Sequence, residues 1–295
     1  MANQVKLIFG AAFIDSLSDE TLQEFLDILE NNGVKEIDTA RLYTGSEKAL
    51  GDARAPARFT IDTKAPAFFN GSLSKSSVLA GAKQSLNELG VEQVTMATTL
   101  NTDENPDTPL EETLSAIQEV FEAGTFVRFG LSNFTPAQVQ EIYDIMLANG
   151  YVLPTVFQGN YNAVARSYES DLFPLLRKLG IRFYAYSPIA GGFLVKTAEA
   201  IKAGIHGSTR WDKNQIYSNL YGKPKLLAAL EVWESIAAEA GMGKAALAYR
   251  WVTCHSDLDA KYGDADGPLP SSVAAKVDNI WEAIKDEAPV DNYHG

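Results

Sequence analysis

Short apolar runs alternate with amphipathic segments along most of this chain, and that alternation limits its fold more than any other feature. The runs have the length of β-strands, and we expect strands at residues 6–9, 36–38, 59–63, 91–99, 126–131, 156–158 and 182–186. The segments between them show helical spacing and begin at capping residues such as Ser18 and Thr135. Regular alternation with short connections predicts a parallel sheet covered by helices.

Seven such units without any second domain favour one closed α/β barrel, the (β/α)8 TIM-type fold, over residues 1–295. Two segments depart from the alternation. Residues 193–222 are predicted to form a long functional loop, in which Trp211 and Tyr217 are candidates for a substrate lid. No strand is recognisable between the helices expected at 244–253 and 271–285, so the eighth strand is expected to be incomplete or irregular.

Charge and cysteine content narrow the partners. The net charge of −13 argues against nucleic acid and anionic membranes. The single cysteine, Cys254, excludes an intrachain disulfide and fits a reducing compartment. No apolar run approaches the roughly 18 residues of a membrane helix, and the first residues do not resemble a signal peptide. No metal-ligand spacing is present, so we expect no metal. These features predict a cytoplasmic protein that acts on a small molecule.

Three polar residues follow strands at the edge where barrel enzymes carry their reactive groups. Asp38 ends the second expected strand, Tyr43 lies in the loop after it, and Lys64 follows the third. A buried lysine that faces an aspartate stays charged, and a cation beside a phenol favours the phenolate and lowers its pKa. Such a tyrosine can protonate a carbonyl oxygen as hydride reaches the carbon. The alternative is a structural ion pair between Asp38 and Lys64, with Tyr43 in the wall.

The arrangement of Asp38, Tyr43 and Lys64 resembles three of the four catalytic residues of the aldo-keto reductase family. The resemblance covers roughly residues 5–255 and resumes in the tail, and it is strongest to the aflatoxin-aldehyde reductase branch and its fungal relatives. It implies NADPH-dependent reduction of an aldehyde or ketone to an alcohol. In that reaction Tyr43 would be the general acid, Lys64 would tune it, and Asp38 would hold Lys64.

The cofactor-binding motifs of that family also have counterparts. Segment 128–134 is similar to the strand-five motif, whose Ser-Asn pair holds the nicotinamide carboxamide, and Gln158 matches the family's glutamine with the same task. Segment 184–192 is similar to the strand-seven motif. By these matches the nicotinamide of NADP(H) would be held by Ser132, Asn133, Gln158 and Tyr186. Ser187 and Gly192 would lie where the chain approaches the pyrophosphate. A homodimer is left open.

Two departures from the family pattern affect function. The fourth catalytic residue of the family is a histidine, and Leu100 takes its position here, or Ala97 if the gap is shifted. Asn101 or Thr99 would then have to supply a neutral hydrogen-bond donor. The segment that holds the adenosine 2′-phosphate and the adenine is missing before residue 266. Losing a positioned acid–base group costs typically 10²–10⁴-fold in rate. The sequence therefore predicts a weakened reductase, with NADP(H) binding in question.

Two other functions remain open on these residues. Tyr43 and Lys64 can move protons without hydride, which would suit a cofactor-independent isomerase, dehydratase or cyclase of secondary metabolism. A non-catalytic relative that binds a ligand or partner is the other alternative. Replacing Tyr43 with Phe separates them, because it should abolish turnover by either enzyme and leave a binding protein unaffected.

Overall fold

A computed structural model describes residues 5–65, 71–100, 108–203, 215–255, 258 and 268–291 of the chain. The chain divides into two compact units. The N-terminal unit contains Leu7–Phe157 and Gly180–Arg182. The C-terminal unit contains Met1–Lys6, Gln158–Leu179 and Phe183–Gly295.

Parallel strands form the centre of the N-terminal unit. They are β1 (Ile8–Gly10), β2 (Glu36–Asp38), β3 (Thr60–Lys64), β4 (Val94–Leu100) and β5 (Phe126–Ser132), each paired in parallel with the next. Among the described residues β6 (Pro154–Asn160) and β7 (Arg182–Tyr186) continue the same order. Lys64 pairs with Thr98, and Leu100 pairs with Ser132. Parallel register therefore brings the carboxyl ends of β2, β3 and β5 to one edge, where Asp38, Lys64 and Ser132 lie.

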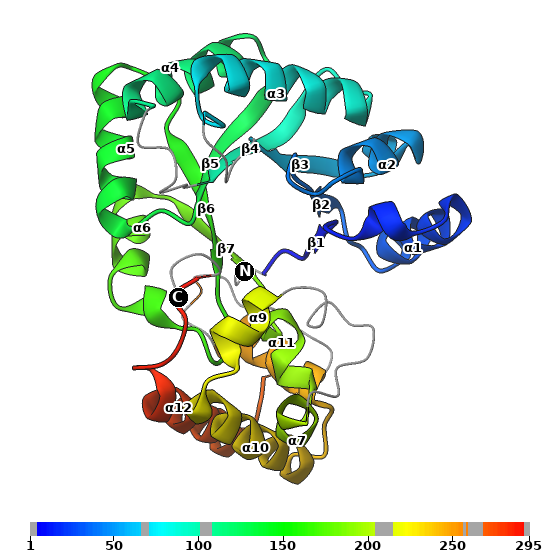
Figure 1. Ribbon diagram of the computed structural model, residues 1–295, viewed down its shortest axis with the longest axis vertical. Coiled ribbons are helices and arrows are strands. Elements are labelled where there is room, and N and C mark those ends of the chain that lie inside the picture. Colours follow the sequence, from blue (N-terminus) through cyan, green and yellow to red (C-terminus); the bar gives the residue numbers. More distant parts are fainter. Residues whose placement is uncertain are drawn as a thin grey trace. The chain divides into compact units, whose positions relative to one another are not determined.

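Helices cover the outside of these five strands (Figure 1). They are α1 (Asp19–Asn31), α2 (Ser46–Asp52), α3 (Lys75–Leu89), α4 (Leu110–Glu122) and α5 (Pro136–Ala148), with 3₁₀ turns at Ile14–Ser16 and Ala55–Ala57. Local sequence sets where they begin. The Ser18 hydroxyl accepts the amide of Thr21, and Thr135 forms a capping box with Gln138. Helix α1 turns an apolar stripe toward the strands, with Leu22 and Leu26 buried.

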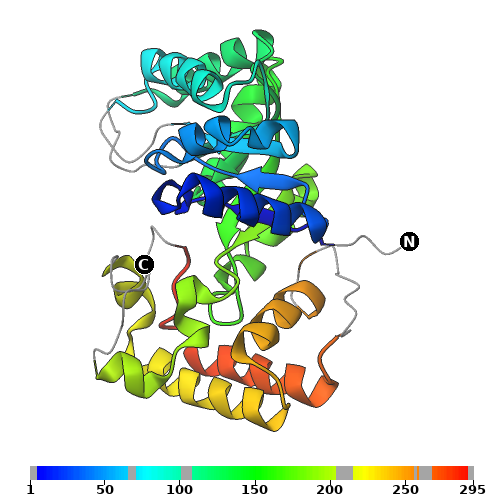
Figure 2. The ribbon, with the colours of Figure 1, turned by 90° about the vertical axis from the view of Figure 1, so that its right-hand side faces the viewer.

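The C-terminal unit is mostly helical. Its helices are α6 (Leu172–Leu179), α7 (Ala198–Lys202), α9 (Gln215–Tyr221), α10 (Pro224–Glu239), α11 (Lys244–Cys254) and α12 (Ser271–Ile284), with 3₁₀ turns η3 (Ser167–Glu169) and η4 (Ala190–Val195). Helices α10 and α12 lie side by side (Figure 2). Trp233 and Trp251 are completely buried, and the Trp233 indole donates to the carbonyl of Leu194. Burial of such large side chains stabilises this unit.

Most predicted elements are confirmed, and several differ. β1 occupies Ile8–Gly10, two residues later than expected, and α2 was not expected. The prediction of a long loop over 193–222 is wrong for its described parts, which form η4, α7 and α9. Tyr217 is only 4% exposed within α9 and is a packing residue there, whereas Trp211 lies outside the described residues. The question of the eighth strand also falls on residues outside the described ranges.

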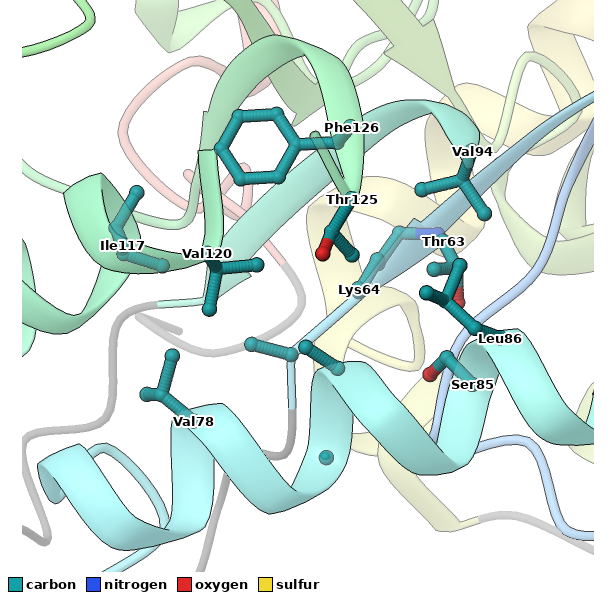
Figure 3. A pocket seen from close by; sticks show the side chains of 13 residues that line it. Thr63, Lys64, Val78, Ser85, Leu86, Val94, Ile117, Val120, Thr125 and Phe126 are labelled. Atoms are coloured by element: carbon teal, nitrogen blue, oxygen red, sulfur yellow. The ribbon is translucent and has the colours of Figure 1, made fainter. Parts of the chain in front are cut away.

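A small apolar cavity of about 40 Å³ lies between β3 and the helices α3 and α4. Figure 3 shows Val78 and Ser85 of α3 and Ile117 and Val120 of α4 turned toward it. Gly81 of α3 also lines it. The cavity is apolar, so it offers bound water too few hydrogen-bond partners.

Candidate active site

An ion pair between Asp38 and Lys64 forms the centre of the candidate site. The ammonium of Lys64 lies 2.6 Å from each carboxylate oxygen of Asp38 and 2.8 Å from the carbonyl oxygen of Thr39. Its three N–H donors therefore have three acceptors. The side chains of Lys64 and Asp38 are 3% and 11% exposed. The ammonium is thus held in one position, because a buried charge needs all of its hydrogen bonds.

The surroundings of Lys64 keep it charged. Burial by itself lowers the pKa of Lys64, because the ammonium loses hydration. The neighbouring Asp38 and Tyr43 act in the opposite direction and prevail, so the pKa of Lys64 lies above the ordinary value for lysine. A cation is therefore present at this point of the site throughout the physiological pH range.

Tyr43 lies beside this cation. The Lys64 Nζ atom is 5.2 Å from the centroid of the Tyr43 ring. The loop that carries Tyr43 is tied down by a buried hydroxyl pair, since Ser46 Oγ lies 2.8 Å from Thr39 Oγ1 and donates to the carbonyl of Ala11. The structure thus brings together the three residues that the sequence singled out as catalytic, all within the N-terminal unit.

Glu47 supports this arrangement and was not expected from the sequence. Its carboxylate is 1% exposed and accepts hydrogen bonds from the Thr63 hydroxyl at 2.6 Å and from Arg41. Arg41 also pairs with Glu88 of α3 at 2.9 Å. Glu47 therefore connects the loop around Tyr43 with the strand that ends in Lys64. It belongs to a helix absent from the predictions, so no strand-end argument pointed to it.

Ser132 and Asn133 follow at the end of β5 in the same unit. Ser132 is the last residue of the strand, and both residues are buried. Asn133 has a φ of 61°, in the left-handed region that few residues other than glycine adopt. Such backbone strain is often found where a protein holds a functional side chain.

The other predicted cofactor residues belong to the C-terminal unit. Gln158 lies within β6 and is 9% exposed, while Tyr186 ends β7. Ser187 and Gly192 lie in the loop that follows, with φ of 55° and 101°. Among the described residues, no atom beyond its two chain neighbours lies within 4 Å of the position that a Cβ on Gly192 would take, so the backbone is open on that side.

Sequence comparison identifies the family of the chain. The model of the aldo/keto reductase family matches residues 6–281. The chain belongs to the aldo/keto reductase family. Membership confirms the predicted (β/α)8 class of fold, and the parallel order of the described strands agrees with it. It also supports carbonyl reduction as the general class of activity for this aldo/keto reductase.

Several named relatives are similar over nearly their whole length. Oxidoreductase sirO of Leptosphaeria maculans is 34% identical over 96% of this chain and 95% of its own. Human aflatoxin B1 aldehyde reductase member 2 is 34% identical over 87% of this chain and 80% of its own. An aldo-keto reductase of Pseudocercospora fijiensis is 33% identical over 88% of this chain and 97% of its own. The predicted resemblance to the aflatoxin-aldehyde reductases and fungal relatives is therefore confirmed.

The lengths of these matches bear on the predicted deletion. The match to sirO extends over 319 positions, whereas this aldo/keto reductase has 295 residues. The fungal relative therefore carries residues without a counterpart here. This agrees with the predicted missing segment.

The position of the fourth catalytic residue is only partly described. Leu100 is the last residue of β4 and pairs with Ser132, so its backbone lies at the site edge of the sheet. The structure describes only the backbone of Leu100, Ala97 and Thr99, and Asn101 lies outside the described residues. Neither leucine nor alanine can donate a hydrogen bond from its side chain.

Two further observations concern the described residues. They contain no cluster of three or more His, Cys, Asp or Glu side chains that could hold a metal ion. No helix in the described part of the aldo/keto reductase is long and apolar enough to cross a membrane.

Proposed function

We propose that this aldo/keto reductase reduces an aldehyde or ketone with NADPH, using Tyr43 as general acid. The observation that carries the proposal is the fully bonded ammonium of Lys64, held by Asp38 and 5.2 Å from the Tyr43 ring. Relatives named as aflatoxin B1 aldehyde reductases favour an aldehyde as the substrate. Small-molecule carbonyl compounds are therefore the partners to test.

The reaction assigns one task to each of the three residues. NADPH, when bound, supplies the hydride to the carbonyl carbon. Tyr43 donates its hydroxyl proton to the carbonyl oxygen, and the Lys64 ammonium stabilises the phenolate that remains. Asp38 does not touch the substrate in this scheme, and its carboxylate keeps Lys64 charged and in place.

The side chains present have the hydrogen-bonding groups that a nicotinamide cofactor requires. Asn133 and Gln158 carry buried side-chain amides, which can both donate to and accept from a carboxamide. We assign them, with Ser132 and Tyr186, to the nicotinamide. The open, glycine-containing turn at Ser187 and Gly192 suits an approach of backbone to phosphate, because Gly192 adds no side chain there.

Binding of the cofactor is the first test. The purified, folded protein is titrated with NADPH and with NADH by calorimetry. Micromolar binding of NADPH would support the proposal, and aldehydes would then be screened by following NADPH oxidation, with Tyr43→Phe as the inactive control. Absence of binding at millimolar cofactor would overturn the reductase proposal.

A second candidate is proton transfer without hydride, as in an isomerisation, dehydration or cyclisation. It is favoured by Leu100 at the end of β4 and by the residues that sirO carries without a counterpart here. Turnover of a carbonyl compound that persists without any nicotinamide, and that Tyr43→Phe abolishes, would establish this activity. Turnover that depends on NADPH would exclude it.

A further inference from the structure

Three completely buried polar residues of the C-terminal unit form a hydrogen-bonded network outside the proposed catalytic residues. The Asn160 amide donates to the Tyr221 hydroxyl at 3.1 Å, and the Asn162 amide lies 3.4 Å from the same hydroxyl. Asn162 also donates to the side-chain oxygen of Asn160 at 3.3 Å. All three residues are 0% exposed. Burying so many polar groups is costly unless they bond one another, so this network requires a specific arrangement of its members.

The network extends to the loop after β7. The Asn162 amide donates to the carbonyl oxygen of Ser187 at 3.1 Å, and the Ala190 amide donates to the same oxygen at 2.8 Å. The Asn162 side-chain oxygen accepts the amide of Val164, which fixes which way the side chain points. Asn162 therefore connects the end of β6 with the first residue of this loop.

Two residues of this loop, Ser187 and Ala190, have a backbone conformation that their residue types do not favour. Ser187 and Ala190 have φ of 55° and 53°, and Gly191 and Gly192 have φ of 63° and 101°. The left-handed region is unfavourable for serine and alanine because of their Cβ atoms. Residues in such conformations persist only when their surroundings hold them there.

Helix α9 supplies the surroundings on the other side. The ring of Tyr221 stacks on Phe193 with centroids 5.5 Å apart and planes at 20°. A Cβ added to Gly191 would lie 2.1 Å from Cε1 of Tyr217, so the ring of Tyr217 packs directly on the loop backbone. α9 thus contacts the loop through two rings, and the Tyr221 hydroxyl adds the polar connection to Asn160 and Asn162.

We propose that Tyr221 is a positioning residue, whose hydroxyl acts through Asn160 and Asn162 to hold the left-handed residues of the Ser187–Gly192 loop in place for a dinucleotide phosphate. The ligand in this inference rests on the proposed function. The restraint of the loop does not, and it can be measured without any cofactor.

The first experiment measures amide hydrogen exchange of residues 187–195 in the free protein. Tyr221→Phe keeps the ring on Phe193 and removes only the hydroxyl. Exchange of the Ala190, Gly192 and Leu194 amides, which are all hydrogen-bonded in this loop, should become about tenfold faster, because the hydrogen bonds of the buried Tyr221 hydroxyl to Asn160 and Asn162 are lost. Asn160→Ala removes the partner of that hydroxyl together with the bond from Asn162 to Asn160, and it should accelerate exchange of the same amides, so the result does not depend on one variant folding.

Tyr161→Phe is the matched control. Tyr161 is also 0% exposed, but its hydroxyl donates to Glu169 at 2.6 Å rather than to the network. It should leave the exchange of residues 187–195 unchanged. Unchanged exchange in Tyr221→Phe would overturn the proposal that Tyr221 restrains the loop. Equal acceleration in Tyr221→Phe and Tyr161→Phe would also overturn it.

The second experiment measures the dissociation constant of NADPH by calorimetry. The dissociation constant should rise about tenfold in Tyr221→Phe and stay unchanged in Tyr161→Phe. In steady-state assays of Tyr221→Phe the KM for NADPH should rise, while kcat should stay within about twofold of the wild-type value. Faster exchange with an unchanged dissociation constant would overturn the role in cofactor binding. If the wild type binds no NADPH, the proposed function and the ligand named here both fail, while the exchange experiment still decides whether Tyr221 holds the loop.

Discussion

The carboxylate of Glu47 accepts a hydrogen bond from the hydroxyl of Thr63 across 2.6 Å, and so fastens the helix after Tyr43 to the strand that ends in Lys64. Glu47 also accepts from Arg41 and is almost completely buried. Glu47, which is not one of the proposed catalytic residues, therefore helps to keep Tyr43 and Lys64 adjacent. Precise positioning of this kind is a large part of what a protein contributes to catalysis.

Glu47→Gln is expected to destabilise the protein by about 1–3 kcal/mol, because the amide nitrogen would face a donor inside the protein. Urea unfolding measures the change. Asp52→Asn is the control, because Asp52 is 65% exposed in its pair with Lys48 and such pairs contribute little. An equal, small effect of both changes would show that the buried bonds of Glu47 do not stabilise the fold.

Lys64→Met should lower kcat for carbonyl reduction by roughly 10²–10⁴-fold, since the cation beside Tyr43 is lost. Stopped-flow measurement of NADPH oxidation in a single turnover separates this step from cofactor binding. The dissociation constant of NADPH should stay near the wild-type value. A variant that keeps wild-type kcat would remove Lys64 from the mechanism.

The raised pKa of Lys64 predicts a specific loss of stability at alkaline pH. Because the pKa in the folded protein exceeds the unfolded value of 10.5, the stabilisation is fully present below pH 10.5 and is lost as pH rises through the folded pKa. Urea midpoints above pH 10.5 should therefore fall more steeply for the wild type than for Lys64→Met. Parallel curves would contradict the assignment.

Gly81→Ala and Gly159→Ala should have opposite effects on stability. Gly81 lies inside α3 beside the apolar cavity, so a methyl group there should stabilise by about 0.5–1 kcal/mol through helix propensity. A Cβ on Gly159 would lie 2.7 Å from Cε2 of Tyr168 and 2.8 Å from Cε2 of Phe183, so this change should destabilise by roughly 1–3 kcal/mol through overpacking. Thermal unfolding compares the two, and a shift in the same direction would refute the packing argument.

Much of the fold followed from local pattern. Ser18 and Thr135 cap helices as expected, and β2, α6 and β7 have the predicted bounds. These features depend on residues a few positions apart, which the sequence displays directly. The loop predicted over 193–222 was misread because the apolar residues of its short helical turns show too few periods to be recognised.

Some residues of the candidate site were likewise predicted from local pattern, and others were not. Asp38, Tyr43 and Lys64 were predicted from their positions after strands, and the parallel register brings them together. Glu47 and Tyr221 were not, because the bonds that give them importance reach Thr63 and Asn160, which are distant in sequence. No periodic pattern records a contact of that kind.

The sequence by itself determined the order of strands and helices, the family and the three residues proposed for proton transfer, because local spacing and motif residues carry that information. Only the tertiary structure decided that Lys64 is fully bonded by Asp38 and Thr39, that Glu47 fastens the Tyr43 loop, and that Ser187 adopts a strained backbone beside Asn162. These are properties of buried polar groups. Their hydrogen-bond partners come from separate elements of the fold. A polar group must have such a partner only when it is buried, and burial exists only in the folded chain.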